Sequence, residues 1–170
     1  MLVISGTLPP YVDSDFYVGF VREATRMGVR VVIDSQGPAL LNVLELGPAL
    51  AKMTVAELGA TARADVTSEE CILRAMRQLI TLGAHAVLVT HGGQSAYLMM
   101  QGERSWRLSP PTADVRVLNP IGSGDCTSAG IAHSLMAGGD LLGAVRLGMG
   151  CGSANAETLV PADFVPQRAA

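Results

Sequence analysis

Cysteine, aromatic residues and charge are all scarce in this sequence. The three cysteines are odd in number, lie far apart and form no CxxC pair, so neither a disulfide framework nor a zinc site is indicated. Only 16% of the residues are charged and the formal net charge is -3, with no basic run interleaved with aromatics. This composition argues against nucleic-acid binding, which depends on a positively charged surface.

Long hydrophobic runs are also lacking. The weakly apolar stretch 131–151 is interrupted by His133, Asp140 and Arg146, and it therefore does not resemble a membrane span of about 18 or more apolar residues. The first residues have no basic segment of the kind that opens a signal peptide. We therefore expect a soluble, cytoplasmic protein without a membrane partner.

What the sequence does have is a globular composition. Its 170 residues are 49% apolar, and 19 glycines are spread along the chain without forming a repeat. A chain of this length can bury one hydrophobic core and is short for two ordinary domains. We predict a single domain over residues 1–170.

Helical and strand-like segments alternate along most of the chain. The strand-like runs are continuous rather than alternating in polarity, which is typical of parallel strands covered on both faces. From residue 92 onward the pattern changes to two short runs around a turn, which indicates a hairpin at the sheet edge. Strands are predicted at 2–4, 29–33, 86–90, 96–100, 105–108 and 115–118, and helices at 13–27, 40–46, 67–82, 125–137 and 141–151. The fold class is α/β, layered, with a mostly parallel central sheet.

The segment 119–125, NPIGSGD, places two glycines between a strand-like run and a helix. Glycine permits positive φ and close approach, and the first N–H groups of a helix have no intrahelical acceptors. Such a turn suits a phosphate group, and Asp125 in the first helical turn could take a proton from an attacking hydroxyl. The alternative is that Asp125 only caps the helix while Gly122 and Gly124 make a tight turn.

Five further segments, in order along the chain, accompany this turn. They are SGTLPP at 5–10, DSQG at 34–37, KMTVAEL at 52–58, THGGQSA at 90–96 and GSANA at 152–156. Together with GSGD and the following Ala129-Gly130, they resemble the motifs of the ribokinase-like (PfkB) carbohydrate kinases. The front motif resembles the fructose-1-phosphate and tagatose-6-phosphate kinase branch. The resemblance implies a ribokinase-like fold truncated at its N-terminus, because the chain begins inside a strand of that fold and lacks the half that normally carries the sugar-binding residues and the lid.

The resemblance also implies a role for each matching residue. Asp125 would be the catalytic base that deprotonates a sugar hydroxyl, and the backbone of Gly122, Ser123 and Gly124 would form an anion hole for the transferred phosphoryl group. ATP and Mg²⁺ are the implied cofactors, and a sugar or sugar phosphate is the implied substrate.

Four more residues would serve the nucleotide and the metal. Lys52 would lie near the nucleotide phosphates, Thr90 and Gly92 would line the phosphates and ribose, and Asn155 would sit near the adenine. Glu57 would act on Mg²⁺ through water. Without the resemblance, Lys52 and Glu57 form an ordinary solvated pair, and Asn155 is a helix cap or a local backbone partner.

Two departures from the family pattern bear on function. Met53 and Thr54 stand where the family has Pro and Asn, and Ser95 stands where it has a glycine. The altered segment 52–57 and the missing front half motivate a second hypothesis, a catalytically silent module that binds nucleotide or forms a homodimer through an unpaired sheet edge.

A dinucleotide-binding enzyme is disfavoured. The glycines at 148, 150 and 152 fall late in a helical stretch, whereas the dinucleotide fingerprint lies between a first strand and its helix.

Overall fold

The computed structural model describes residues 1–102, 104–110 and 115–168. They divide into two compact units, Met1–Arg107 and Leu108–Ala170. Because the mutual arrangement of the units is not described, the single domain over 1–170 stays a prediction.

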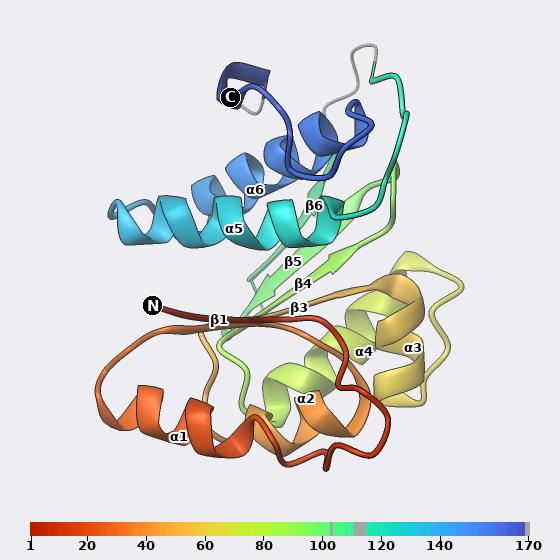
Figure 1. Ribbon diagram of the computed structural model, residues 1–170. Coiled ribbons are helices and arrows are strands. Elements are labelled where there is room, and N and C mark those ends of the chain that lie inside the picture. Colours follow the sequence, from red (N-terminus) through yellow and green to blue (C-terminus); the bar gives the residue numbers. More distant parts are fainter. Residues whose placement is uncertain (103, 111–114, 169–170) are drawn as a thin grey trace. The chain divides into compact units, whose positions relative to one another are not determined.

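A six-stranded sheet in the order β1-β2-β3-β4-β5-β6 organises the first unit (Figure 1). Strands β1 (Leu2–Ser5), β2 (Val31–Asp34), β3 (Leu50–Thr54) and β4 (Ala86–Thr90) are parallel neighbours. Strand β5 (Ala96–Met100) runs antiparallel to β4, and β6 (Arg104–Leu108) follows it at the edge. The predicted α/β fold with a mostly parallel sheet is confirmed.

Four helices cover one face of this sheet (Figure 1). They are α1 (Val18–Arg26), α2 (Gly37–Leu44), α3 (Val55–Ala62) and α4 (Glu69–Thr81). The core between helices and sheet includes Ile33, Met53, Val87, Leu40 and Leu79, each of them buried. Side chains one position apart on a strand point to opposite faces, yet successive residues of β2 to β4 are buried, as the continuous apolar runs predicted.

In the second unit, helices α5 (Ser123–Met136) and α6 (Leu141–Ala156) pack side by side (Figure 1). Small residues at the contact let the two helices approach closely. A Cβ on Gly148 would lie 2.5 Å from the carbonyl oxygen of Thr127, and one on Gly152 would lie 2.9 Å from that of Ser123. Gly148 and Gly152 therefore serve helix packing, which agrees with rejecting a dinucleotide fingerprint there.

Two predictions about elements need correction. The run 115–118, predicted as a strand, is irregular, and Leu118 N donates instead at 2.7 Å to the carbonyl oxygen of Ala156, the last residue of α6. The strand β3 and helix α3 were not predicted as elements, although residues 52–58 were singled out as a motif. In the described residues, no helix is long and apolar enough to span a membrane.

Candidate active site

The carboxyl ends of the parallel strands in the first unit carry a buried ion pair. Lys52 Nζ donates to Asp34 Oδ2 at 2.6 Å, and the Lys52 side chain is only 3% exposed. The two residues are register partners on the adjacent strands β2 and β3. The alternative that Lys52 forms a solvated pair with Glu57 is therefore wrong, since Lys52 is buried and its acidic partner is Asp34.

Glu57 has a different local role. It is the third residue of α3, where its carboxylate accepts from the backbone N–H of Thr54 at 2.7 Å while Thr54 Oγ1 accepts from Glu57 N at 3.3 Å. This is a complete capping box, in which two otherwise unpaired N–H groups are satisfied reciprocally. Thr54 thus keeps the capping function that an Asn could provide at the same place.

Thr90 ends β4 beside this capping box. It is the register partner of Thr54, and its Oγ1 lies 3.5 Å from the carbonyl oxygen of Met53. Gly92 follows in an exposed turn with a φ of 55°, in the left-handed region that favours glycine. The first unit therefore brings Lys52, Thr90 and the start of α3 to one edge of the sheet, because the carboxyl ends of parallel strands meet there.

The second unit contains the glycine turn. Gly122 has a φ of 82° and is the N-cap of α5, where no side chain caps the helix. Asp125 is exposed and lies in the first helical turn. The alternative that Asp125 is the N-capping residue is therefore wrong, because the cap position belongs to Gly122.

The N–H groups of this turn differ in their bonding. Ser123 N donates to Pro120 O at a long 3.2 Å. For Gly124, which is exposed, no protein acceptor to its N–H is found among the described residues. Such N–H groups, beside the positive end of a helix macrodipole, form a site suited to an anion.

Asn155 lies beneath the turn. Its side chain is fully buried and bonded to Ile121 O, Ser123 Oγ and Ala162 N. These contacts show a structural function that the sequence motif did not reveal. The adenine contact that was inferred for Asn155 stays a prediction.

Cys126, next to Asp125, is a buried thiol. Burial raises its pKa, and the charges that Cys151 and Asp125 can carry raise it further. The thiol is therefore held in its neutral form near pH 7, unlike the lowered pKa of a reactive cysteine.

The described residues offer few side chains that could bind a metal ion together. Across the residues that the structure describes, no group of three or more His, Cys, Asp or Glu side chains is placed to hold a metal ion. Mg²⁺ usually retains several waters and binds one or two carboxylates together with substrate phosphates, so a lone carboxylate such as Glu57 fits its ordinary mode of binding.

Residues 1–168 match the pfkB family carbohydrate kinases. The chain belongs to this family. The resemblance drawn from the GSGD turn and its companion motifs is thereby confirmed.

Individual relatives agree with this assignment. The pfkB chain is 32% identical to 1-phosphofructokinase of Rhodobacter capsulatus over 86% of its own length and 45% of that protein. It is 32% identical to tagatose-6-phosphate kinase of Staphylococcus epidermidis over 79% of its length and 43% of that protein. It also superimposes on the tetrameric inhibited form of phosphofructokinase-2 from Escherichia coli, with a TM-score of 0.81 and 30% identity, covering 91% of this chain and 51% of that one. This pfkB chain spans about half the length of these relatives.

Proposed function

We propose that this pfkB chain takes part in the ATP-dependent phosphorylation of an alcohol group on a sugar or sugar phosphate. The observation that carries the proposal is the exposed Asp125 in the first turn of a helix that opens on a left-handed glycine. A carboxylate beside outward-facing N–H groups can accept a proton while those groups stabilise negative charge.

In the proposed reaction, the sugar hydroxyl oxygen forms a bond to the γ-phosphorus of ATP. The bond between that phosphorus and the bridging oxygen breaks, and ADP leaves with the electron pair. The hydroxyl proton passes to the Asp125 carboxylate. The N–H groups of Gly122, Ser123 and Gly124 hold the charge on the transferring phosphoryl group, which is most of what such a reaction asks of a protein.

The residues at the strand ends would serve the donor. Lys52 is an ammonium with three N–H donors, of which Asp34 accepts one, so it retains donors for a phosphate oxygen. Thr90 and the backbone of Gly92 would line the phosphates and ribose. Glu57 would hold Mg²⁺ through water, and the metal would neutralise charge on the β- and γ-phosphates.

The substrate class is testable with a small panel. The purified chain is incubated with Mg-ATP and, separately, fructose 1-phosphate, fructose 6-phosphate and tagatose 6-phosphate, and the bisphosphate product is measured by mass spectrometry. We expect one of the three to be converted in proportion to enzyme concentration. Absence of product from all three, together with no binding of Mg-ATP by calorimetry, would contradict the proposed function.

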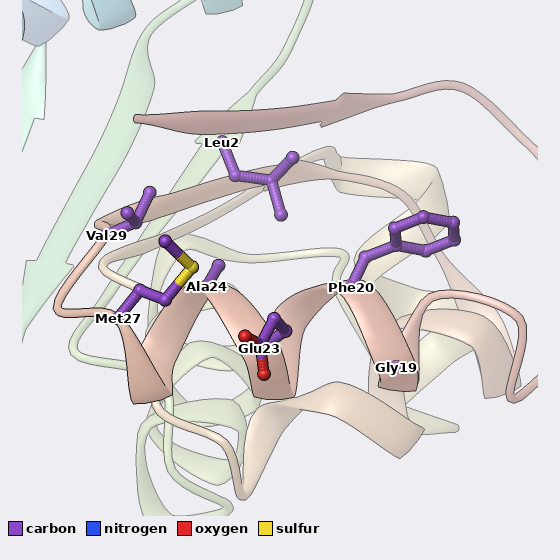
Figure 2. A pocket seen from close by; sticks show the side chains of 7 residues that line it. All are labelled: Leu2, Gly19, Phe20, Glu23, Ala24, Met27 and Val29. Atoms are coloured by element: carbon purple, nitrogen blue, oxygen red, sulfur yellow. The ribbon is translucent and has the colours of Figure 1, made fainter.

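We also infer a homodimer, from an apolar surface in the first unit. Strand β1 lies at the edge of the sheet, and beside it a hollow of about 500 Å³ is lined mainly by apolar side chains (Figure 2). Phe20 and Met27, which line it, are 56% and 65% exposed. An open strand edge next to exposed apolar side chains favours association with another chain.

Light scattering tests this association. We expect a dimer mass that falls toward the monomer in Phe20→Glu but persists in Arg22→Glu, which changes charge elsewhere on the same helix. A monomer in the unchanged protein would contradict the dimer.

A further inference from the structure

Asn155 is a fully buried amide whose bonding capacity is completely used. Its Nδ2 donates to Ile121 O and to Ser123 Oγ, each at 2.9 Å. Its Oδ1 accepts from Ala162 N at 2.7 Å and lies 3.4 Å from Cys126 Sγ. Two donors and two lone pairs are all that a carboxamide side chain possesses, and its 0% exposure leaves no surface for a ligand to contact.

Its partners flank the residue on which the turn depends. Ile121 and Ser123 are the neighbours of Gly122, whose φ is positive. One N–H of Asn155 therefore holds the backbone carbonyl before this glycine, and the other holds the Ser123 side chain after it. The following N–H groups, of Ser123 and Gly124, take their direction from this backbone.

Asn155 also ties a second segment to the turn. Its bond to Ala162 holds the loop after α6, in which Ala162 adopts a φ of 63° that is unusual for a residue other than glycine. The adjacent Pro161 packs over the turn, where its Cβ would be 3.1 Å from a Cβ built on Gly122. The turn is thus held from beneath by the amide and covered by the loop that the same amide anchors.

We propose that Asn155 is a positioning residue, which sets the direction of the N–H groups at Ser123 and Gly124 and acts on the reaction only through them. The inference rests on the proposed function, since it gives those N–H groups the transferring phosphoryl group as their ligand. It differs from the predicted adenine contact in mechanism, because a positioning amide acts through the backbone of the turn and not by touching the nucleotide.

The informative substitution is Asn155→Asp. It has nearly the same shape, but its carboxylate cannot donate to Ile121 O, so that carbonyl would face a buried negative charge instead. Ile131→Val serves as the control for a general loss of stability. Ile131 is buried in α5, and removing one methylene group from it lowers the free energy of unfolding by about 1 kcal/mol.

The first measurement needs no catalysis. In ¹⁵N-labelled protein without nucleotide, Asn155→Asp is expected to shift the amide signals of Gly122, Ser123 and Gly124, whereas Ile131→Val leaves them in place. Unshifted turn signals in folded Asn155→Asp would overturn the positioning proposal, whether or not the chain is a kinase. Should Asn155→Asp fail to fold, the same signals are compared in Asn155→Ser, which removes the donors without adding charge.

The second measurement separates positioning from adenine contact. The kcat of Asn155→Asp is measured with the sugar phosphate that the substrate panel identifies. We expect it to be about 100-fold below that of the unchanged protein, since misplacing a reacting group by about 1 Å can cost this much. The fall should be equal with ATP and GTP, and the Kd for Mg-ATP should stay near its original value. A loss confined to ATP, or a weakened Kd with unchanged kcat, would overturn the proposal in favour of adenine contact. Failure of the unchanged protein to turn over would count against the proposed function and leave the amide-signal test to decide the role of Asn155.

Discussion

The two units of the chain hold their candidate site residues in opposite ways. In the first unit, Lys52 and Glu57 are engaged by protein partners, an aspartate and a capping threonine. In the second unit, Asp125 and Gly124 are exposed, while the side chain of the buried Asn155 bonds to the residues on either side of Gly122.

This difference lies in exposure, since the Lys52 side chain is buried whereas Asp125 lies at the surface, where solvent and a substrate can reach it. A side chain whose polar atoms are already bonded contributes to the free energy of unfolding, and its removal leaves a partner unsatisfied. An exposed carboxylate contributes little to stability and can therefore be placed for catalysis. We expect substitutions in the first unit to lower mainly the free energy of unfolding, and substitutions at the turn to lower mainly kcat.

The largest expected effect is on rate. Asp125→Asn should lower kcat by about 10²- to 10⁴-fold, the usual contribution of a general base, while the thermal midpoint changes little because the side chain is exposed. Steady-state kinetics and thermal denaturation are measured on the same preparation. Asp163→Asn, the same change of charge at another exposed position of the unit, should leave both quantities unaltered. Full activity in Asp125→Asn would remove the proposed base.

The next largest effect is expected on the free energy of unfolding, at the buried ion pair of Lys52 and Asp34. Lys52→Met leaves the Asp34 carboxylate without its partner, and breaking a buried pair costs about 3 kcal/mol. Urea denaturation measures this loss. The double substitution Lys52→Met with Asp34→Leu should recover part of it, because no charge is then left unpaired. If Lys52→Met alone were as stable as the unchanged chain, the proposed difference between the two units would be contradicted.

Some of the structural features behind these effects could be predicted from the sequence, and others could not. The continuous apolar runs of β2 and β4 indicated parallel strands, and the helix predicted at 67–82 corresponds to α4, which Ser68 caps. The GSGD motif located the turn because the positive φ of Gly122 favours glycine there, and this requirement is local in sequence.

Long-range pairing accounts for what was missed. The Asp34–Lys52 ion pair depends on the register of β2 with β3, and a strand as short as Leu50–Thr54 containing a lysine did not suggest burial. Likewise, the predicted strand at 115–118 is an irregular segment held by Ala156 O, an acceptor far away in the chain. The bonds of Asn155 join residues about 30 positions apart and could not be inferred from the GSANA motif.

Helix packing in the second unit provides a smaller test of the comparison. A Cβ at Gly148 would lie 2.5 Å from Thr127 O and 2.6 Å from Ile131 Cγ1, so Gly148→Ala should cost about 1–3 kcal/mol by overpacking. Gly143→Ala is the matched control in the same helix. There the nearest atom would be 3.6 Å away, and the gain in helix propensity should leave stability equal or higher. Equal stability of both variants would show that the α5–α6 contact tolerates a methyl group.

The smallest effect is expected at the capping box. Thr54→Ala removes the side-chain acceptor for Glu57 N and should cost about 1 kcal/mol. Thr54→Asn places the residue of the family motif there and should retain the cap, since Asn is as good an N-cap as Thr. Thermal denaturation distinguishes the two, and an equal loss in both would contradict the capping role.

The central claim is that the N–H groups of the glycine turn bind the phosphoryl group. It is tested most directly by titrating the ¹⁵N-labelled chain with Mg²⁺ and a non-hydrolysable ATP analogue and following each amide signal. The account predicts that Ser123 and Gly124 shift with increasing ligand, while Gly138 and Gly139, beyond the other end of α5, do not. Binding of the analogue with no change at Ser123 and Gly124 would contradict it.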